Sequence, residues 1–273
     1  MVEKHNEPLR VLSLGAGVQS TTLALMSARG DLPMVDCAIF ADTGWESSEV
    51  YQHLDWLETQ LPFPVHRVKR EGLDLGELSI AVASGDRPME GNPLPPFFTK
   101  NPDARLQLQC SKEFKTRVIG RKVRELVGLA YGERGPKSVI VEQWLGLSAD
   151  ERWRMKDAEA KWTVNRFPLI ELDMRRFHCL RWMEERQYPP PPRSSCIFCM
   201  NRTNAEWRHL RDNLPDDWAK AVKFDEAIRH IVKEGTAYVH KSGPLADADL
   251  STPADHGQTE FGFLQECEGM CGV

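Results

Sequence analysis

Cysteines are the residues of this 273-residue chain whose type and spacing most directly suggest chemistry. Cys196 and Cys199 form a C-x-x-C pair, and Cys267 and Cys271 lie close together in the last residues. Thiolates at C-x-x-C spacing can bind one metal ion or one cluster. A thioredoxin-type redox pair is the competing interpretation, but this pair follows a run of prolines instead of opening a helix after a strand.

The other cysteines differ in their context. Cys110 directly precedes an expected helix and is a fifth candidate ligand. Cys37 lies in an apolar run and Cys179 in a helical stretch, so we predict that both are core residues, as free cysteine often is. All-sulfur ligation suits zinc or an iron–sulfur cluster, and the residues alone leave both metals open.

A loop of small residues is the second feature with chemical potential. The segment from Ser13 to Thr22 reads SLGAGVQSTT and joins an apolar run to an expected helix over Gln19–Arg29. Small residues let a ligand approach the backbone, and a helix start favours a phosphate. The segment is neither a Walker loop nor a GxGxxG fingerprint, and a plain tight turn is the alternative.

A second turn, Ala41-Asp42-Thr43-Gly44, follows another apolar run over Val35–Phe40. Ligands of open α/β sheets bind outside the carboxyl ends of the strands, so both turns are expected at one edge of the sheet. Asp42 could bind a ribose hydroxyl or a metal ion there, and capping of the next helix is the simpler interpretation.

The elements that must position these residues alternate between strand and helix. Helical spacing over Ser47–Leu61 is followed by a strand candidate at Val65–Val68, a helix over Ser111–Val127 and a further strand within Ser138–Leu147. This order predicts an α/β fold with a parallel sheet. The prolines at 189–192 predict an extended linker, and helices are expected over Thr203–Asn213 and Asp216–Lys233.

Composition is that of a globular protein, with 41% hydrophobic residues, 27% charged residues and a net charge of -5. No run approaches the roughly 20 apolar residues of a membrane helix. The polar start, Met1 to Pro8, lacks a signal-peptide pattern, so we expect a cytoplasmic protein whose cysteines serve metal or redox chemistry. One expected helix carries Trp207, Arg208 and Arg211, which could bind nucleic acid, although a surface helix with one buried Trp explains them equally well.

In this order, the motifs resemble the PP-loop ATPase superfamily, specifically its PAPS-reductase-like proteins. The resemblance covers nearly the whole chain. It is carried by the Ser13–Thr22 loop, the Asp42-Thr43-Gly44 turn, Cys110, the segment 146–151 and Cys196-x-x-Cys199. The ending ECEGMCG, residues 266–272, looks like that of stand-alone members found in phages and other mobile elements.

The resemblance implies a mostly parallel, five-stranded HUP-type sheet flanked by helices. We expect a nucleotide-binding domain over residues 1–170 and a helical, cysteine-bearing region over 171–273 packed on it. The implied function is binding of ATP with Mg²⁺, or of a sulfonucleotide, by an ATP pyrophosphatase that acts in sulfur transfer or nucleotide activation. The implied partners are a nucleic-acid acceptor or a sulfur-donor protein.

The resemblance also assigns residues to roles. The nucleotide-binding set is Ser13, Gly15, Ala16, Gly17, Gln19, Ser20, Thr21, Asp42, Thr43, Gly44, Gly146 and Ser148. Arg152, Arg154 and Lys156 are candidates to neutralise phosphate or substrate, with a solvated helix face as the alternative. The metal set is Cys110, Cys196, Cys199 and Cys271 for a [4Fe–4S] cluster, or alternatively for Zn²⁺, which leaves Cys267 free or catalytic.

The chain departs from the family pattern in its loop. Gly15 to Ser20 replace the usual Ser-Gly-Gly-Lys-Asp-Ser, so the lysine and the aspartate are absent. Two other functions are open. One is a thiol-dependent PAPS or APS reductase in which Cys267 or Cys271 attacks sulfur. The other is a non-catalytic nucleotide-binding module that carries a structural zinc ion in a partner complex.

Overall fold

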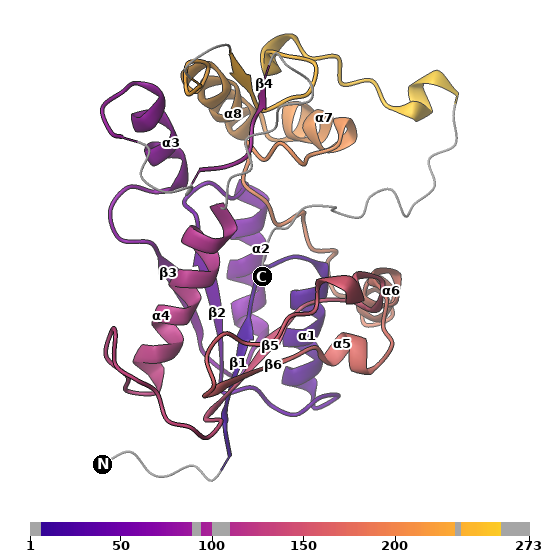
Figure 1. Cartoon of the computed structure of the whole chain (residues 1–273). Helices are drawn as coiled ribbons and strands as arrows, with labels where there is room; N and C mark the ends of the chain where they lie inside the picture. Colours follow the sequence, from indigo (N-terminus) through magenta and orange to yellow (C-terminus); the bar gives the residue numbers. More distant parts are fainter. Residues whose placement is uncertain (1–6, 89–93, 100–109, 233–235, 258–273) are drawn as a thin grey trace. The chain divides into compact units, whose positions relative to one another are not determined.

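The computed structural model describes residues 7–88, 94–99, 110–232 and 236–257. They form two compact units, each built from several chain segments (Figure 1). Unit 1 comprises residues 1–42, 49–68 and 117–194, and unit 2 comprises residues 43–48, 69–116 and 195–273. Within the described ranges, no helix has both the length and the apolar character needed to span a membrane.

Unit 1 is built on a five-stranded sheet in the order β3-β2-β1-β5-β6. The strands are β1 (Leu9–Ser13), β2 (Cys37–Asp42), β3 (Val65–Lys69), β5 (Val141–Leu145) and β6 (Thr163–Arg166). The β1–β2, β1–β5 and β5–β6 pairs are parallel, and Ser13 lies opposite Leu145. The predicted α/β class, with a mostly parallel sheet and flanking helices, is confirmed.

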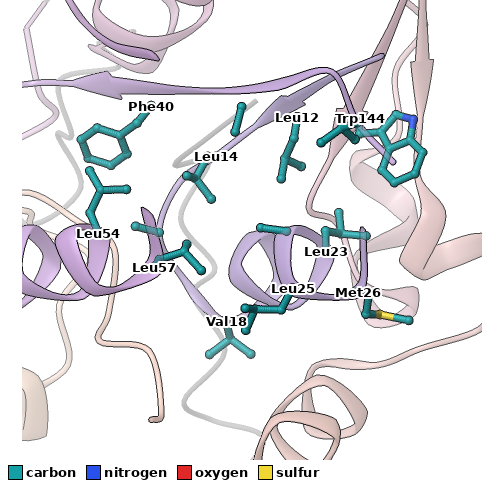
Figure 2. Close-up of a cluster of buried hydrophobic side chains, with 14 of the residues drawn as sticks. Leu12, Leu14, Val18, Leu23, Leu25, Met26, Phe40, Leu54, Leu57 and Trp144 are labelled. Carbon is teal, nitrogen blue, oxygen red and sulfur yellow. The ribbon is translucent and has the colours of Figure 1, made fainter. Parts of the chain in front are cut away.

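Helices cover both faces of this sheet. They are α1 (Val18–Arg29), α2 (Ser48–Gln60), α4 (Arg117–Leu126), α5 (Pro168–Glu171) and α6 (Arg176–Glu184). On one face, Leu12 and Phe40 pack with Leu23 of α1 and Leu54 of α2 (Figure 2). On the other face, the alternate strand residues pack against α4, as Ile39 does with Val123. This double cover explains why β2 is buried along its whole length.

Unit 2 is mainly helical and has its own apolar core. Its elements are α3 (Leu75–Ala83), β4 (Phe98–Thr99), a π-helical turn at Lys112–Thr116, α7 (Asn204–Asn213), α8 (Pro215–Ala227), β7 (Ala237–Tyr238) and two 3-10 turns at Leu245–Asp247 and Pro253–His256. Phe198 stacks on Phe224 with 3.8 Å between ring centroids, and the ring centroids of Trp45 and Phe198 lie 5.2 Å apart. β4 and β7 form a separate antiparallel pair.

The two units differ from the expected division at residue 170. Residues 171–194 belong to unit 1, since Cys179 and Met183 of α6 lie in the same core as Leu23. The turn after β2 and the segment after β3 belong to unit 2. Two expected helices also differ in extent. The one over Ser111–Val127 begins as a π-helical turn, and the one expected to reach Lys233 ends at Ala227.

Candidate functional site

The site in unit 1 begins where the direction of the sheet order reverses. From β1 the chain runs outward through β2 to β3, and it later returns on the other side of β1 as β5 and β6. Ligands of open α/β sheets bind outside the carboxyl ends of the strands at such a switch point. The two loops that leave the sheet there follow Ser13 and Leu145, which lie opposite one another.

The loop after β1 leads directly into α1. Gly17 is the N-cap of α1 and supplies no side-chain cap, and Thr21 N donates to Gly17 O at 2.9 Å. Helix geometry therefore leaves the amides of Val18, Gln19 and Ser20 without an acceptor in the helix, and the positive end of the helix dipole lies there. These amides and the dipole together favour an anion.

The conformation of the loop is fixed from within unit 1. Ala16 is buried and left-handed, with φ of 57°, which costs about 1 kcal/mol or more for a residue with a Cβ. The Gly15 amide donates to Ser20 Oγ at 3.2 Å, and Ser194 Oγ donates to the Gly15 carbonyl. A left-handed residue is a recurring part of backbone hollows that bind anions.

The loop after β5 lies against the start of α1. A Cβ added at Gly146 would lie 2.9 Å from Ser20 N and 3.0 Å from Ser20 Cα. Only a glycine fits this contact without a shift of the backbone. Ser148 is fully buried, and its hydroxyl accepts from Gln19 Nε2 at 3.4 Å. Gly146 and Ser148, both of the predicted nucleotide-binding set, thus contact the first turn of α1.

Gln19 connects three elements of unit 1. Its amide nitrogen also donates to Glu151 Oε2 at 3.1 Å, and its amide oxygen accepts from Arg176 Nη1 at 3.2 Å. The backbone amide of Arg176 donates to the Asp150 carboxylate at 3.3 and 3.4 Å, which anchors the start of α6. An arginine that sequence reasoning did not select therefore contacts the loop.

The basic residues predicted from the sequence to bind phosphate do not contact Gln19 as Arg176 does. Arg152 lies 2.9 Å from Asp173, and its side chain is 57% exposed. Arg154 forms a salt bridge with Glu151, and Lys156 is exposed. An acidic side chain thus balances each of the two arginines, and the solvated-face alternative fits Arg152 and Lys156.

The other nucleotide-set residues of unit 1 lie at the carboxyl end of the sheet or in α1. Ser13 Oγ accepts from Gln143 Nε2 at 2.8 Å. Asp42, at the end of β2, accepts from Tyr51 Oη at 2.8 Å. Thr21 is fully buried and shares a 3.1 Å hydrogen bond with the ring of His53. Thr21 is therefore a core residue of unit 1.

Thr43 and Gly44 lie in unit 2, beside the C-x-x-C turn. Thr43 Oγ1 donates to Glu46 Oε1 at 3.3 Å and lies 3.2 Å from Cys196 Sγ. Gly44 has φ of 82°, and a Cβ on it would lie 2.8 Å from Asp74 Oδ2. The nucleotide set taken from the resemblance is thus divided between the two units.

A buried carboxylate accompanies Cys196. Glu46 and Cys196 form an antiparallel bridge, and Lys115 Nζ lies 3.4 Å from Glu46 Oε1. Burial and then the Glu46 charge raise the pKa of the Cys196 thiol, and the charge of Cys110 acts in the same direction. Within the described chain, Glu46 Oε2 and Ser195 Oγ are buried without a hydrogen-bond partner. Sequence reasoning did not select Glu46, because a glutamate after a turn gives no signal of burial.

Arg202 holds the C-x-x-C turn. Its guanidinium donates to the carbonyls of Ser195 at 3.1 Å and of Cys196 at 3.2 Å. The amide of Cys199 donates to Cys196 O at 3.0 Å. The turn is therefore fixed through its backbone.

The predicted metal-binding cysteines lie partly outside the described residues. Cys110, Cys196 and Cys199 lie in unit 2, whereas Cys267 and Cys271 lie outside the described residues. Among residues 7–88, 94–99, 110–232 and 236–257, no three His, Cys, Asp or Glu side chains are grouped so that they could hold a metal ion. The described residues alone therefore do not fit a four-thiolate centre.

The two remaining described cysteines are core residues, as predicted. Cys37 is 4% exposed and Cys179 is fully buried. Burial raises the pKa of Cys37 to about 11 and that of Cys179 to about 12, so both stay protonated thiols at neutral pH. Trp207 of α7 is also fully buried in unit 2, and this favours the surface helix with one buried Trp.

Comparisons with solved structures give likenesses in fold. No protein-family model matches the chain, and no curated protein matches it. The chain is similar to the phosphate complex of phosphoadenylyl-sulfate (PAPS) reductase from Candida auris, with 14% sequence identity and a TM-score of 0.45. The likeness covers 68% of this chain and 76% of that chain.

Proposed function

We propose that unit 1 binds an adenine nucleotide, ATP or a sulfonucleotide, with its phosphates on the loop between β1 and α1. The observation that carries this proposal is the meeting of two glycine loops at the switch point of the sheet. Gly146 contacts the backbone of Ser20, directly beside the amides at the start of α1. Unpaired amides, a helix dipole and a close backbone approach are what a phosphate site requires.

The proposal has two sources. Phosphate binding follows from the arrangement of the loops, whereas the adenine base and the chemistry follow from the resemblance of the motifs to PAPS-reductase-like proteins. On that resemblance, the chain is an enzyme of sulfur transfer or nucleotide activation. Fixed amides at the loop would orient the phosphates and stabilise negative charge as it develops there. The loop itself contains no lysine or arginine.

Gly146→Ala tests the phosphate site. The added methyl group would displace the first turn of α1, since it would lie 2.9 Å from a backbone nitrogen. We expect ATP affinity, measured by isothermal titration calorimetry, to fall by about tenfold or more, which corresponds to about 1.4 kcal/mol. ATP binding that is as tight in Gly146→Ala as in the unaltered chain would contradict the proposal.

Gly120→Ala is the matched control. Gly120 lies in the exposed part of α4, and a Cβ there meets no atom within 4 Å. The substitution should leave ATP affinity unchanged and stabilise the helix by about 0.5–1 kcal/mol. Urea unfolding of both variants would separate a loss of binding from a loss of folding.

A metal centre is a separate part of the proposal. We infer that Cys110, Cys196, Cys199 and Cys271 hold a [4Fe–4S] cluster, or alternatively zinc. The support is the C-x-x-C spacing of Cys196 and Cys199 together with the resemblance of the motifs, which adds Cys110 and a tail cysteine. A bound cation would also offset the buried negative charge of Glu46 beside Cys196. Such a centre would supply structural support or redox chemistry.

A further inference from the structure

The proposed phosphate site needs a positive charge that its loop does not provide. Residues 13–22 contain neither lysine nor arginine. Backbone amides and a helix dipole contribute only partial charges, whereas the phosphates of ATP carry several full negative charges. We therefore expect a side-chain cation from outside this loop to contribute to the site if it binds a nucleotide.

Arg176 is placed to provide this charge. It is the first residue of α6, and its Nη1 donates to Gln19 Oε1 at 3.2 Å, in the first turn of α1. A guanidinium has five N–H donors, so one bond to an amide leaves most of its hydrogen-bonding capacity for another acceptor. Arg176 is half-buried, and its charge is therefore screened less than that of an exposed arginine.

Several arginines on neighbouring elements are paired with carboxylates. Arg154 pairs with Glu151, Arg152 with Asp173, Arg166 with Glu171 and Arg181 with Glu185. Arg176 forms no salt bridge with any residue in the described part of the chain. Its guanidinium is thus a half-buried positive charge at the loop without a salt-bridge partner among the described residues.

Gln19 holds Arg176 in this position. The amide oxygen of Gln19 faces Arg176, because its amide nitrogen donates to Glu151 and Ser148 at 3.1 and 3.4 Å. Glu151 is in turn held by Arg154. A neutral amide at this place fixes the guanidinium without cancelling its charge, which a carboxylate would do.

We propose that Arg176 binds the phosphates of the nucleotide and supplies the cation that the loop between β1 and α1 lacks, with Gln19 as its positioning residue. This inference rests on the proposed function, because it assigns a residue to the same phosphate site. It also replaces Arg152, Arg154 and Lys156 as the main phosphate contacts. The ligand class is an adenine nucleotide with at least one phosphate group.

The test measures binding of ATP, AMP and adenosine to the full chain and to Arg176→Gln and Arg176→Lys. We expect Arg176→Gln to weaken ATP binding by about 10- to 100-fold, the usual effect of losing hydrogen bonds to a charged group. AMP binding should weaken less, and any adenosine binding should not change. Arg176→Lys keeps the charge and should recover part of the loss.

Two further variants sharpen the test. Gln19→Glu places a carboxylate against Arg176 and should weaken ATP binding although the shape of the side chain is kept. Arg181→Gln removes an exposed arginine of the same helix, whose side chain is 73% exposed, and should have no effect. Circular dichroism and urea unfolding of each variant show whether it is folded.

The outcomes separate the two proposals. If the unaltered chain binds no adenine nucleotide, the proposed function fails. If it binds ATP and Arg176→Gln binds ATP equally well, the role of Arg176 is refuted while the proposed function stands. Equal losses for ATP and adenosine in a folded Arg176→Gln variant would also refute it, since they would indicate a general disturbance of the site.

Discussion

At the scale of single residues, buried polar groups show most clearly how unit 1 is constrained. His53 of α2 is 7% exposed, shares a hydrogen bond with Thr21 and packs on Trp56 with 5.2 Å between ring centroids. Burial lowers the pKa of His53 to about 4, so the imidazole is neutral in the folded protein at neutral pH. Protonating it requires a charge in the core.

We therefore predict that His53 makes stability depend on pH. Between about pH 6.5 and 4 the unfolded chain binds the proton and the folded protein does not, so stability falls as the pH is lowered, by up to about 1.4 kcal/mol per pH unit. His53→Gln keeps a hydrogen-bonding side chain but does not titrate. Urea unfolding of both proteins at pH 7, 6 and 5 should show that the unaltered chain's excess in free energy of unfolding becomes smaller toward low pH. An excess that stays constant would contradict His53 as the origin of this pH dependence.

The residue scale also shows the limit of sequence reasoning. Gly15, Gly17 and Gly146 could be selected from their types and their places after strands, and of the three only Gly146 has a neighbouring backbone so close that a Cβ would not fit. Arg176 could not, because its role depends on α6 reaching Gln19, a contact 157 positions away in the sequence. The burial of Glu46 beside Cys196 likewise depends on a bridge between distant segments.

At the scale of elements, buried strands and their following helices were predictable. β1 and β2 lie in apolar runs and β5 in a stretch rich in strand-forming residues, and each leads into one of the segments that the resemblance selected. β6 was missed because Thr163–Arg166 reads TVNR, a short stretch that is not buried. It joins the sheet at its edge by pairing with β5, which a local pattern does not reveal.

The C-x-x-C turn is the element on which the metal proposal depends. We predict that protein purified without oxygen absorbs broadly near about 400 nm and contains about four irons per chain, as cysteinyl clusters do. Cys196→Ser and Cys199→Ser should lose the iron. Cys37→Ser, a cysteine in the core of unit 1, should keep it.

Metal analysis, together with the absorption spectrum, distinguishes an iron–sulfur cluster from a zinc ion at this centre. A colourless protein with one bound zinc ion per chain would replace the cluster by the zinc alternative. A protein that is folded and free of metal, or that keeps its iron in Cys196→Ser, would overturn the proposed ligand set. Because loss of either metal can destabilise a fold, unfolding curves accompany each cysteine variant.

At the scale of the whole molecule, neither compact unit is one continuous stretch of the sequence. The order of the motifs along the chain predicts a boundary at residue 170. In the structure, unit 1 extends to residue 194, and unit 2 includes residues 43–48. The core explains why, since Leu169 and Met183 pack with Leu23 of α1. The chain therefore passes from unit 1 to unit 2 at Asp42-Thr43 and again at Ser194-Ser195.

The central claim is that nucleotide phosphates bind where the loops after β1 and β5 meet. Hydrogen exchange of the full chain, followed by mass spectrometry with and without saturating ATP, tests it most directly. We expect ATP to slow exchange in peptides covering Gly15–Thr22 and Gly146–Glu151, and adenosine to slow it less. Unchanged exchange in both peptides at saturating ATP, or protection confined to other segments, would contradict the claim.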